Sequence, residues 1–292
     1  MNTLSTLLLA ALITAKEAGR AIIEIYQSGF DVQYKNDHSP LTIADKRSHE
    51  IIVAYLANQT SHPLGELPVL SEEGKKIPFK ERSKWKYFWL VDPLDGTKEF
   101  VKRNGEFTVN IALINHSRPV LGVIFVPDKN VLYFAAENLG AYKCDRSDIV
   151  ELISETIAVN KKAELFRTII DGSSKLPLYD SQSIPHDSQI TIVGSRSHPT
   201  EELNEFVKTM RKKYDQVRFI SAGSSLKLCM VAEGKADIYP RLGPNMEWDI
   251  AAGQAIVEQA HWSVLNSETD EPLQYNKENL LNPWFIVRKK SG

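Results

Sequence analysis

The spacing of apolar residues predicts two helices at the start of the chain. Over 4–28, apolar residues recur every three or four positions, and the apolar run at 7–15 continues without a break through Lys16 and Arg20. No basic residue precedes that run, so an amphipathic helix explains it better than a secretory signal does. A second helix is predicted over 42–58, after the polar segment YKNDHSPLT.

Short apolar runs predict strands in the middle of the chain. Two of them, at 67–70 and 87–91, end in acidic residues, as expected of strands that deliver carboxylates at their C-terminal ends. Three more, at 107–115, 119–126 and 131–136, are separated by the turn-forming segments NHSR and PDKN. Such short connections predict an antiparallel meander.

The second half of the chain alternates between strand and helix patterns. Polar residues over 145–155 predict a domain boundary near residue 155. Beyond it, strands are predicted at 168–171, 189–194, 216–220 and 236–240, and helices at 200–214, 224–233 and 249–259. This alternation is typical of α/β proteins. We therefore expect an α+β domain over 1–155, which contains the meander, and an α/β domain over 156–292.

Composition and charge narrow the class of protein. The chain has 292 residues, 42% of them hydrophobic, and a formal net charge of −2. These values predict a globular protein without the positive field that binding to a nucleic-acid polymer requires. No stretch approaches the ~20 apolar residues of a transmembrane helix. The two cysteines, Cys144 and Cys229, are too few for a disulfide framework, which favours a reducing, cytoplasmic location. No oligomeric state follows from the sequence.

The spacing of glycines and histidines excludes several common active sites. Neighbouring glycines are never closer than nine positions, so the chain contains no dinucleotide-binding fingerprint, P-loop or serine nucleophile elbow. Histidines are never closer than eleven positions, which excludes a zinc helix of the HxxxH type.

The segment WLVDPLDGTKEF carries the most specific chemistry. An apolar strand leads directly into Asp92 and Asp95, and Pro93 between them predicts a tight turn. Asp95 and Thr97 are suitable N-cap residues for a helix that begins near Lys98. Carboxylates favour a hard cation and the free amides of a helix start favour phosphate, so this turn can hold Mg²⁺ and phosphate together.

Two further acidic elements lie far away in the sequence. VLSEEG places Glu72 and Glu73 after an apolar strand, and MEWDIAAG places Asp249 at the start of a helix rich in small residues. An isolated acidic residue is usually a solvated surface charge. Three such elements flanked by apolar residues instead predict a cluster of carboxylates, whose mutual repulsion requires cations.

Together these motifs resemble a known family. LSEEG, WLVDPLDGTKEF and EWDIAAG are similar to the three defining motifs of the inositol monophosphatase superfamily of Mg²⁺-dependent, lithium-sensitive phosphatases, over about 4–287. The segments KNDHSPLTIAD, DGTKEFVKRNGEFTVNIALI and SAGSSLKLCMVAEGKADIYPR resemble those of the CysQ-type 3'(2'),5'-bisphosphate nucleotidases. The resemblance implies an α/β protein with the layered αβαβα sugar-phosphatase fold.

The resemblance also implies a reaction. Enzymes of this type hydrolyse adenosine 3',5'-bisphosphate to AMP and phosphate in sulfur assimilation, and 3'-phosphoadenosine 5'-phosphosulfate is a further candidate substrate. A cytoplasmic enzyme is expected, and the resemblance leaves open a peripheral association with the cytoplasmic face of the inner membrane.

Residue by residue, the resemblance implies a site for two or three Mg²⁺ ions. The implied ligands are Glu72, Asp92, the backbone carbonyl of Leu94, Asp95 and Asp249, with Glu73 supporting them through water. Asp95 belongs to the N-terminal domain and Asp249 to the C-terminal one. Thr97 is implied to orient the attacking water and Asp45 to take its proton.

The same resemblance implies the substrate contacts. The amides of Gly96 and Thr97 are expected to hold the scissile phosphate. Contacts to the ribose or the second phosphate are expected from Ser224, Ser225, Lys227 and Arg241.

Three alternatives to a bisphosphate nucleotidase differ in how well the sequence fits them. In haloacid-dehalogenase-type phosphatases the DxDGT aspartates are two positions apart, whereas Asp92 and Asp95 are three apart, which excludes that family. An inositol monophosphatase would have the same metal site, although the KEF after DGT and the SSLK segment favour the nucleotide. A catalytically silent metal-binding or regulatory protein could share the fold.

Overall fold

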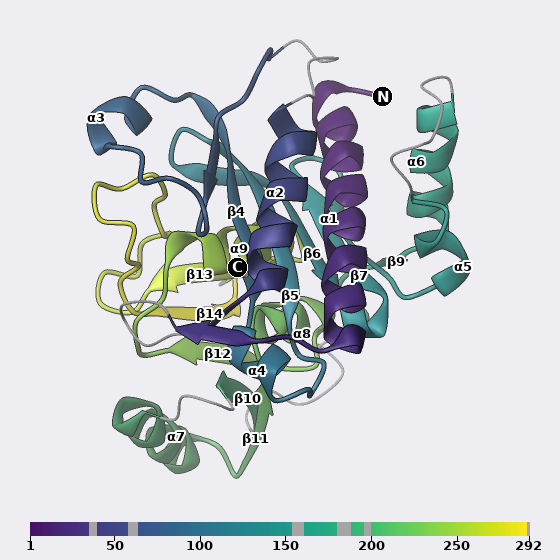
Figure 1. Cartoon of the computed structure of the whole chain (residues 1–292). Helices are drawn as coiled ribbons and strands as arrows, with labels where there is room; N and C mark the ends of the chain where they lie inside the picture. The colour runs from purple at the N-terminus through teal and green to yellow at the C-terminus, as the bar shows by residue number, and fades with distance from the viewer. Residues whose placement is uncertain (35–39, 58–63, 154–160, 180–187, 196–199, 291–292) are drawn as a thin grey trace.

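Helices and sheets alternate in layers in the described structure (Figure 1). The computed structural model describes residues 1–34, 40–57, 64–153, 161–179, 188–195 and 200–290. Within these residues, no helix is long and apolar enough to span a membrane.

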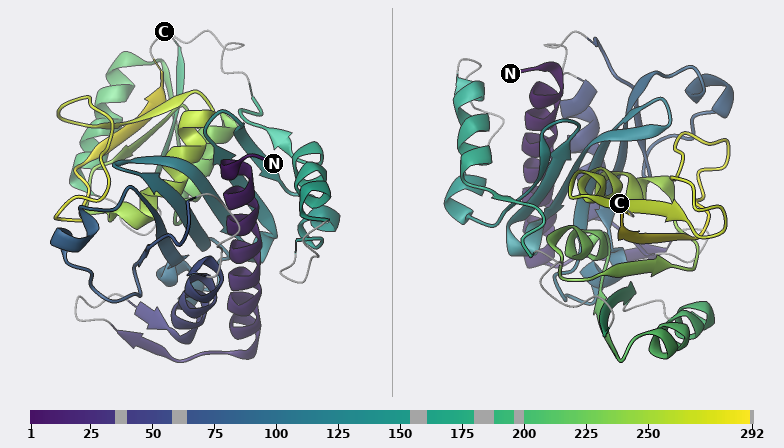
Figure 2. Two further views of the ribbon diagram at one scale, coloured as in Figure 1. Left: turned by 90° about the horizontal axis from the view of Figure 1, so that it is seen from above. Right: turned by 180° about the vertical axis from the view of Figure 1, so that it is seen from behind.

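Two helices form the first layer. Helix α1 (Thr3–Ser28) and helix α2 (Ile43–Ala57) pack against each other and cover one face of a large sheet (Figures 1 and 2). The side chain of Asn2 caps α1 by accepting a 2.8 Å hydrogen bond from the amide of Ser5. Both helices predicted from the apolar spacing are confirmed.

A seven-stranded sheet forms the second layer. In spatial order its strands are β3 (Val69–Ser71), β4 (Tyr87–Asp95), β5 (Thr108–Asn115), β6 (Arg118–Val126), β7 (Val131–Ala136), β8 (Gly140–Cys144) and β9 (Ser174–Lys175). Strands β3 and β4 are parallel, and all the other neighbours are antiparallel. The predicted meander of β5, β6 and β7 is confirmed.

Both faces of this sheet are buried, which explains why its strands read as nearly continuous apolar runs. In β4, Trp89 and Val91 pack toward α1 and α2, whereas Phe88 and Leu90 pack in the opposite direction. Gly122 in β6 allows the next helical layer to approach, because a Cβ there would lie 2.2 Å from the carbonyl oxygen of Ala252.

The remaining layers come from the second half of the chain. Helices α8 (Leu226–Glu233) and α9 (Glu247–Gln259) lie between the two sheets, and α7 (Glu201–Lys213) packs on the outer side of the second one. The second sheet has the order β11 (Gln216–Ala222), β10 (Gln189–Ser195), β12 (Ile238–Arg241), β14 (Phe285–Lys289) and β13 (Trp262–Asn266). This arrangement confirms the expected αβαβα layering.

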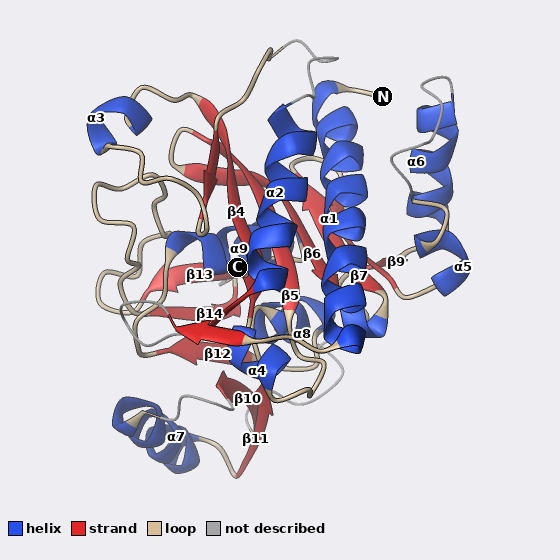
Figure 3. Ribbon diagram, in the orientation of Figure 1, coloured by secondary structure: helices blue, strands red, loops and turns tan. Residues whose placement is uncertain are grey.

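Short elements complete the fold, as the colouring by secondary structure shows (Figure 3). A small antiparallel pair precedes α2, and short helices connect the larger elements. They are β1 (Val32–Tyr34), β2 (Pro40–Thr42), α3 (Phe79–Arg82), α4 (Thr97–Val101), η1 (Pro127–Lys129), α5 (Ser147–Val150) and α6 (Lys162–Asp171).

Two predictions of local structure are wrong. Residues 168–171 were expected to form a strand but end helix α6, because Leu165 and Ile169 lie one helical turn apart and are both buried in the core beside α1. The tight turn at Pro93 is absent as well, since β4 continues to Asp95.

A bulge in β4 takes the place of that turn. Asp92 pairs with Asn110 and Asp95 with Thr108, so three steps along β4 match two steps along β5. Pro93 lies within this bulge. Its missing N–H therefore interrupts no regular ladder of hydrogen bonds between β4 and β5.

The predicted division into domains stays a prediction. The boundary near residue 155 lies outside the described residues. On either side of it, Ile153 and Leu165 belong to the same hydrophobic core.

Candidate active site

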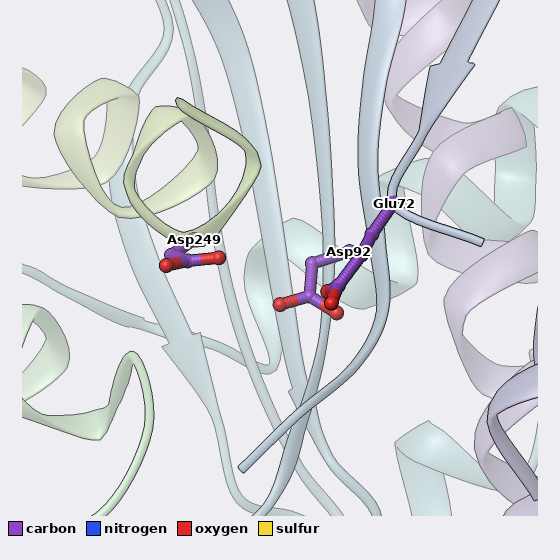
Figure 4. A group of neighbouring side chains, drawn as sticks. All are labelled: Glu72, Asp92 and Asp249. Carbon is purple, nitrogen blue, oxygen red and sulfur yellow. The ribbon is translucent and has the colours of Figure 1, made fainter. Parts of the chain in front are cut away.

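Three carboxylates from different elements converge at one point. Ligand atoms of Glu72, Asp92 and Asp249 all lie within 4.8 Å of one another (Figure 4). Glu72 and Asp92 are neighbours because β3 and β4 are parallel with Ser71 opposite Val91, so the next residue of each strand emerges at the same place. Asp249 faces them from α9.

The protein orients Asp249 before any ligand binds. Its Oδ2 atom accepts a 2.8 Å hydrogen bond from the side-chain amide of Asn245 and a 3.0 Å bond from the backbone amide of Met246. Helix α9 begins two residues earlier than predicted, at Glu247, so Asp249 lies within its first turn. A carboxylate at this position also benefits from the helix dipole.

The carboxylates repel one another. Burial raises the pKa of Asp92 well above its usual value, and the charges of Glu72, Asp95 and Asp249 raise it further. Burial and the neighbouring charges of Asp95 and Glu72 raise the pKa of Asp249 in the same way. Burial and mutual repulsion therefore make the ionised state of these carboxylates unfavourable.

The donor set fits Mg²⁺. The clustered ligand atoms of Glu72, Asp92 and Asp249 are all carboxylate oxygens, and within the described part of the chain no sulfur or imidazole ligand joins them. Hard oxygen donors are what Mg²⁺ prefers, and a divalent cation would neutralise the repulsion that raises these pKa values.

Asp95 lies beside this group on the bulge of β4. Its Oδ2 atom accepts a 3.3 Å hydrogen bond from the side-chain amide of Asn110. Burial raises the pKa of Asp95 to about 6, although the charge of Lys227 opposes the shift. The carbonyl oxygen of Leu94 accepts a 3.4 Å hydrogen bond from Thr97. The metal-binding roles of Asp95 and Leu94 stay predictions.

Asp45 and Thr97 meet although they are 52 positions apart. The hydroxyl of Thr97 donates a 3.1 Å hydrogen bond to Oδ1 of Asp45. The backbone amide and the hydroxyl of Thr42 hold Oδ2 of Asp45, both at 2.7 Å. Burial raises the pKa of Asp45 to about 6, and the charge of Glu73 adds to that increase.

The predicted N-caps of the following helix are wrong. Helix α4 begins at Thr97, its N-cap residue is Gly96, and no side chain caps it. Gly96 has a φ of +90°, a left-handed conformation that favours glycine, so the chain turns there without help from Asp95.

A cleft of about 260 Å³ is lined by carboxylates, among them Asp95 and Asp249. It is also lined by a group of residues that we call the cationic wall: Gly223, Ser224, Ser225, Lys227 and Arg241. All six residues predicted to contact the substrate line this cleft: Gly96, Thr97, Ser224, Ser225, Lys227 and Arg241. Their roles in binding stay predictions.

Several groups of the cationic wall already have protein partners. The ammonium of Lys227 donates to the carbonyl oxygen of Ser224 at 2.5 Å, and burial lowers the pKa of Lys227 to about 8. The guanidinium of Arg241 donates to the carbonyl oxygen of Pro244 at 2.7 Å. The hydroxyl of Ser224 donates to the carbonyl oxygen of Glu106 at 2.8 Å.

The sequence reading missed the polar residues that hold these groups in place. Asn245 contacts Asp249, and Asn110 contacts Asp95. The signal for Asn110 was the alternation of polar residues with apolar ones in TVNIALI, which places Thr108 and Asn110 on one face of a buried strand. No comparable signal marks Asn245.

The chain is similar in sequence to proteins of one known family. The model of the inositol monophosphatase family matches residues 3–281. The 3'(2'),5'-bisphosphate nucleotidase CysQ of Escherichia coli K12 is 41% identical over 276 residues, which cover 94% of this chain and 96% of that protein. The protein of the same name from Haemophilus influenzae is 32% identical, covering 96% of this chain and 92% of that protein.

A solved structure is similar over nearly the whole chain. The crystal structure of CysQ from Bacteroides thetaiotaomicron, described as a bacterial member of the inositol monophosphatase family, superposes with a TM-score of 0.83. It shares 47% sequence identity, and the alignment covers 99% of this chain and 98% of that one.

Proposed function

Because the chain belongs to the inositol monophosphatase family, we propose that it is a Mg²⁺-dependent 3'(2'),5'-bisphosphate nucleotidase that hydrolyses adenosine 3',5'-bisphosphate to AMP and phosphate. One observation carries the choice of substrate. The cleft is lined both by carboxylates and by the cations Lys227 and Arg241. A substrate with two phosphates can place one at the carboxylates, through Mg²⁺, and the other on the cations, whereas inositol 1-phosphate has a single phosphate.

The carboxylates of the cleft would hold two or three Mg²⁺ ions. The ligands would be Glu72, Asp92, Asp249, Asp95 and the carbonyl of Leu94, with Glu73 supporting them through water. Bound Mg²⁺ would supply Lewis-acid stabilisation of the phosphate oxygens and lower the pKa of water. The convergence of carboxylates whose pKa values are raised by burial and repulsion supports this assignment.

Asp45 and Thr97 would move the proton of the attacking water. The hydroxyl of Thr97 can accept a hydrogen bond from water while it donates its own proton to Asp45, which fixes the direction of transfer. With a pKa of about 6, Asp45 is ionised at neutral pH yet basic enough to accept a proton. Thr42 holds the carboxylate in place during the transfer.

The remaining contacts would bind the nucleotide. The amides of Gly96 and Thr97 would hold the scissile phosphate, because free amides at the start of a helix or turn bind anions. Lys227 and Arg241, beside Ser224, would bind the second phosphate. A pKa of about 8 leaves Lys227 mostly protonated at neutral pH.

The proposal extends to a second substrate and to a location. 3'-Phosphoadenosine 5'-phosphosulfate carries the same 3'-phosphate and a sulfated 5' end, so we propose it as a further substrate, in sulfur assimilation. A cytoplasmic location, with or without attachment to the inner face of the inner membrane, fits the two free cysteines Cys144 and Cys229.

A substrate comparison tests the proposal. Phosphate release with MgCl₂ is measured for adenosine 3',5'-bisphosphate, 3'-AMP and inositol 1-phosphate. We expect the bisphosphate to have the highest kcat/KM, and Li⁺ to inhibit. Faster hydrolysis of inositol 1-phosphate would favour the inositol monophosphatase alternative, and no hydrolysis of any of the three would favour a silent metal-binding protein.

The variant Arg241→Met tests whether Arg241 binds the second phosphate. Loss of one charge-assisted contact should raise KM for the bisphosphate by about 10-fold. The KM for 3'-AMP, which lacks the 5'-phosphate, should change by less than about 2-fold. Equal losses for both nucleotides would remove Arg241 from the proposed contact.

A further inference from the structure

Glu106 and two alternate residues of strand β5 contact three consecutive residues of the cationic wall. Glu106 precedes β5, and Thr108 and Asn110 lie within it, so the side chains of Thr108 and Asn110 point to the same side. They face the segment Gly223–Ser225, which leads into α8. Val109 points to the opposite side of β5 and packs in the hydrophobic core between the seven-stranded sheet and helices α1 and α2.

Glu106 holds the first two residues of that segment. Its Oε2 atom accepts a 2.7 Å hydrogen bond from the amide of Gly223, and its carbonyl oxygen accepts the hydroxyl of Ser224 at 2.8 Å. Only glycine fits at 223, because a Cβ there would lie 2.6 Å from Cγ of Glu99 and 2.9 Å from the carbonyl oxygen of Glu106.

The third residue enters a buried network with Asn110. The hydroxyl of Ser225 donates to Oδ1 of Asn110 at 2.8 Å, and the hydroxyl of Thr108 lies 3.0 Å from the same oxygen. The two hydroxyl oxygens are 2.8 Å apart. All three side chains are at most 3% exposed.

Asp95 and the two hydroxyls together fix which way the amide of Asn110 points. A carboxylate oxygen can only accept hydrogen bonds, so Oδ2 of Asp95 takes Nδ2 of Asn110 as its donor, at 3.3 Å. Oδ1 of Asn110 is left on the opposite side, where the hydroxyls of Thr108 and Ser225 hydrogen-bond to it. A backbone hydrogen bond from Ser225 also reaches Asp95.

Asp95 depends on such contacts because of its position. It lies at the end of the β4 bulge, where the strand ladder is irregular and constrains the backbone less than in a regular strand. A carboxylate that binds a cation must be held in a productive orientation, and polar neighbours usually do this.

We propose that Asn110 is a positioning residue that sets the orientation of the Asp95 carboxylate and thereby the affinity for Mg²⁺, with Thr108 and Ser225 acting through Asn110. The hydroxyl of Ser225 then serves the metal site through Asn110. The inference rests on the proposed function in taking Asp95 as a Mg²⁺ ligand. It also links the wall that holds the nucleotide to the metal site.

Calorimetric titration of the full chain with MgCl₂, without substrate, tests the inference. Asn110→Leu keeps the branched shape of the side chain but removes the amide, and it should weaken Mg²⁺ binding by about 10-fold. Thr108→Val should weaken it by about 3-fold, whereas Thr108→Ser, which keeps the hydroxyl, should bind as the wild type does. At saturating Mg²⁺, KM for adenosine 3',5'-bisphosphate should change by less than about 2-fold in all three.

Val109→Ala is the matched control. It lies between Thr108 and Asn110, is equally buried, and faces the other side of the sheet. It should lower the melting temperature without changing Mg²⁺ affinity. If it weakens Mg²⁺ binding as much as Asn110→Leu does, the effect is general destabilisation and the inference is wrong.

Further outcomes decide whether the inference about Asn110 holds. Wild-type Mg²⁺ affinity in Asn110→Leu would overturn the inference, and if that variant does not fold, wild-type affinity in Thr108→Val would overturn it instead. If wild-type chain binds Mg²⁺ with the expected dependence on Asn110 but hydrolyses no nucleotide, the proposed function fails and the positioning role stands.

Discussion

Two carboxylates in the first turn of α9 have opposite surroundings. Glu247 is fully buried, and it accepts hydrogen bonds from the ammonium of Lys277 at 2.6 Å and from the amides of Asn276 and Lys277. Asp249 lies two residues later and faces other carboxylates, and no ion pair reaches it from the residues that the structure describes.

The difference separates a carboxylate held by an ion pair from one that is proposed to bind Mg²⁺. Burial raises the pKa of Glu247, but the charge of Lys277 and the surrounding hydrogen bonds act to lower it. Burial also raises the pKa of Asp249, and the charges of Asp95 and Glu72 raise it further, whereas the charge of Arg241 acts to lower it. The protein thus supplies an ion-pair partner for Glu247, whereas under the proposed function Asp249 would be neutralised by bound Mg²⁺.

The largest effect should come from Asp249→Asn. The substitution keeps the shape of the side chain but removes a charge that bound Mg²⁺ requires, so kcat/KM for adenosine 3',5'-bisphosphate should fall by about 1,000-fold or more. In EDTA the variant should be at least as stable as the wild type, because one repulsive charge is gone. Urea unfolding and phosphate release measure the two effects. Lower stability in EDTA would contradict the comparison.

Lys277→Met should give the opposite result. It leaves Glu247 buried without its cation, and stability should fall by about 2 kcal/mol, below the cost for a fully buried pair because Lys277 is partly exposed. The kcat of the folded variant should match that of the wild type. Lys208→Met removes an exposed ion pair to Glu205 and should leave urea unfolding unchanged. A loss of activity without a loss of stability would show that Glu247 also serves the site.

The smallest effect concerns pH. The pKa values of Asp92, Asp95 and Asp249 are raised in the folded protein, to about 6 for Asp95. The favourable contribution of these carboxyl groups to the free energy of unfolding is complete below the pKa of the unfolded state, ~3.9. It is lost as the pH rises through the pKa values of the folded state. In EDTA the free energy of unfolding should therefore decrease between pH 5 and 7.5 by an amount on the order of 1 kcal/mol, and the melting temperature should decrease with it.

Mg²⁺ should reverse that trend, because it binds the ionised carboxylates. The increase in melting temperature on adding MgCl₂ should grow from pH 5 to pH 7.5. Asp249→Asn keeps the other titrating groups of the chain, including His49, and serves as the control. Its increase in melting temperature on adding MgCl₂ should depend less on pH. A Mg²⁺ effect that is independent of pH in the wild type would argue against ionised carboxylates as the ligands.

Local patterns were sufficient for most of the architecture. Apolar periodicity predicted α1, α2, the meander and the alternation of the second half, because a helix and a strand each repeat their buried positions at a fixed spacing. The prediction failed where a local preference competed with packing. Residues 168–171 are rich in β-branched side chains, yet α6 forms because Leu165 and Ile169 must reach the same core.

Within the site, the sequence by itself determined which residue types were available: acids after two apolar strands, an acid in a helical turn, and an amide-rich turn. Only the tertiary structure decided which of these charges meet. Glu247 finds its cation 30 positions away, whereas Asp249 meets Asp92, 157 positions away. Charge compensation depends on distances of a few ångströms, and these are set by the packing of elements that are remote along the chain.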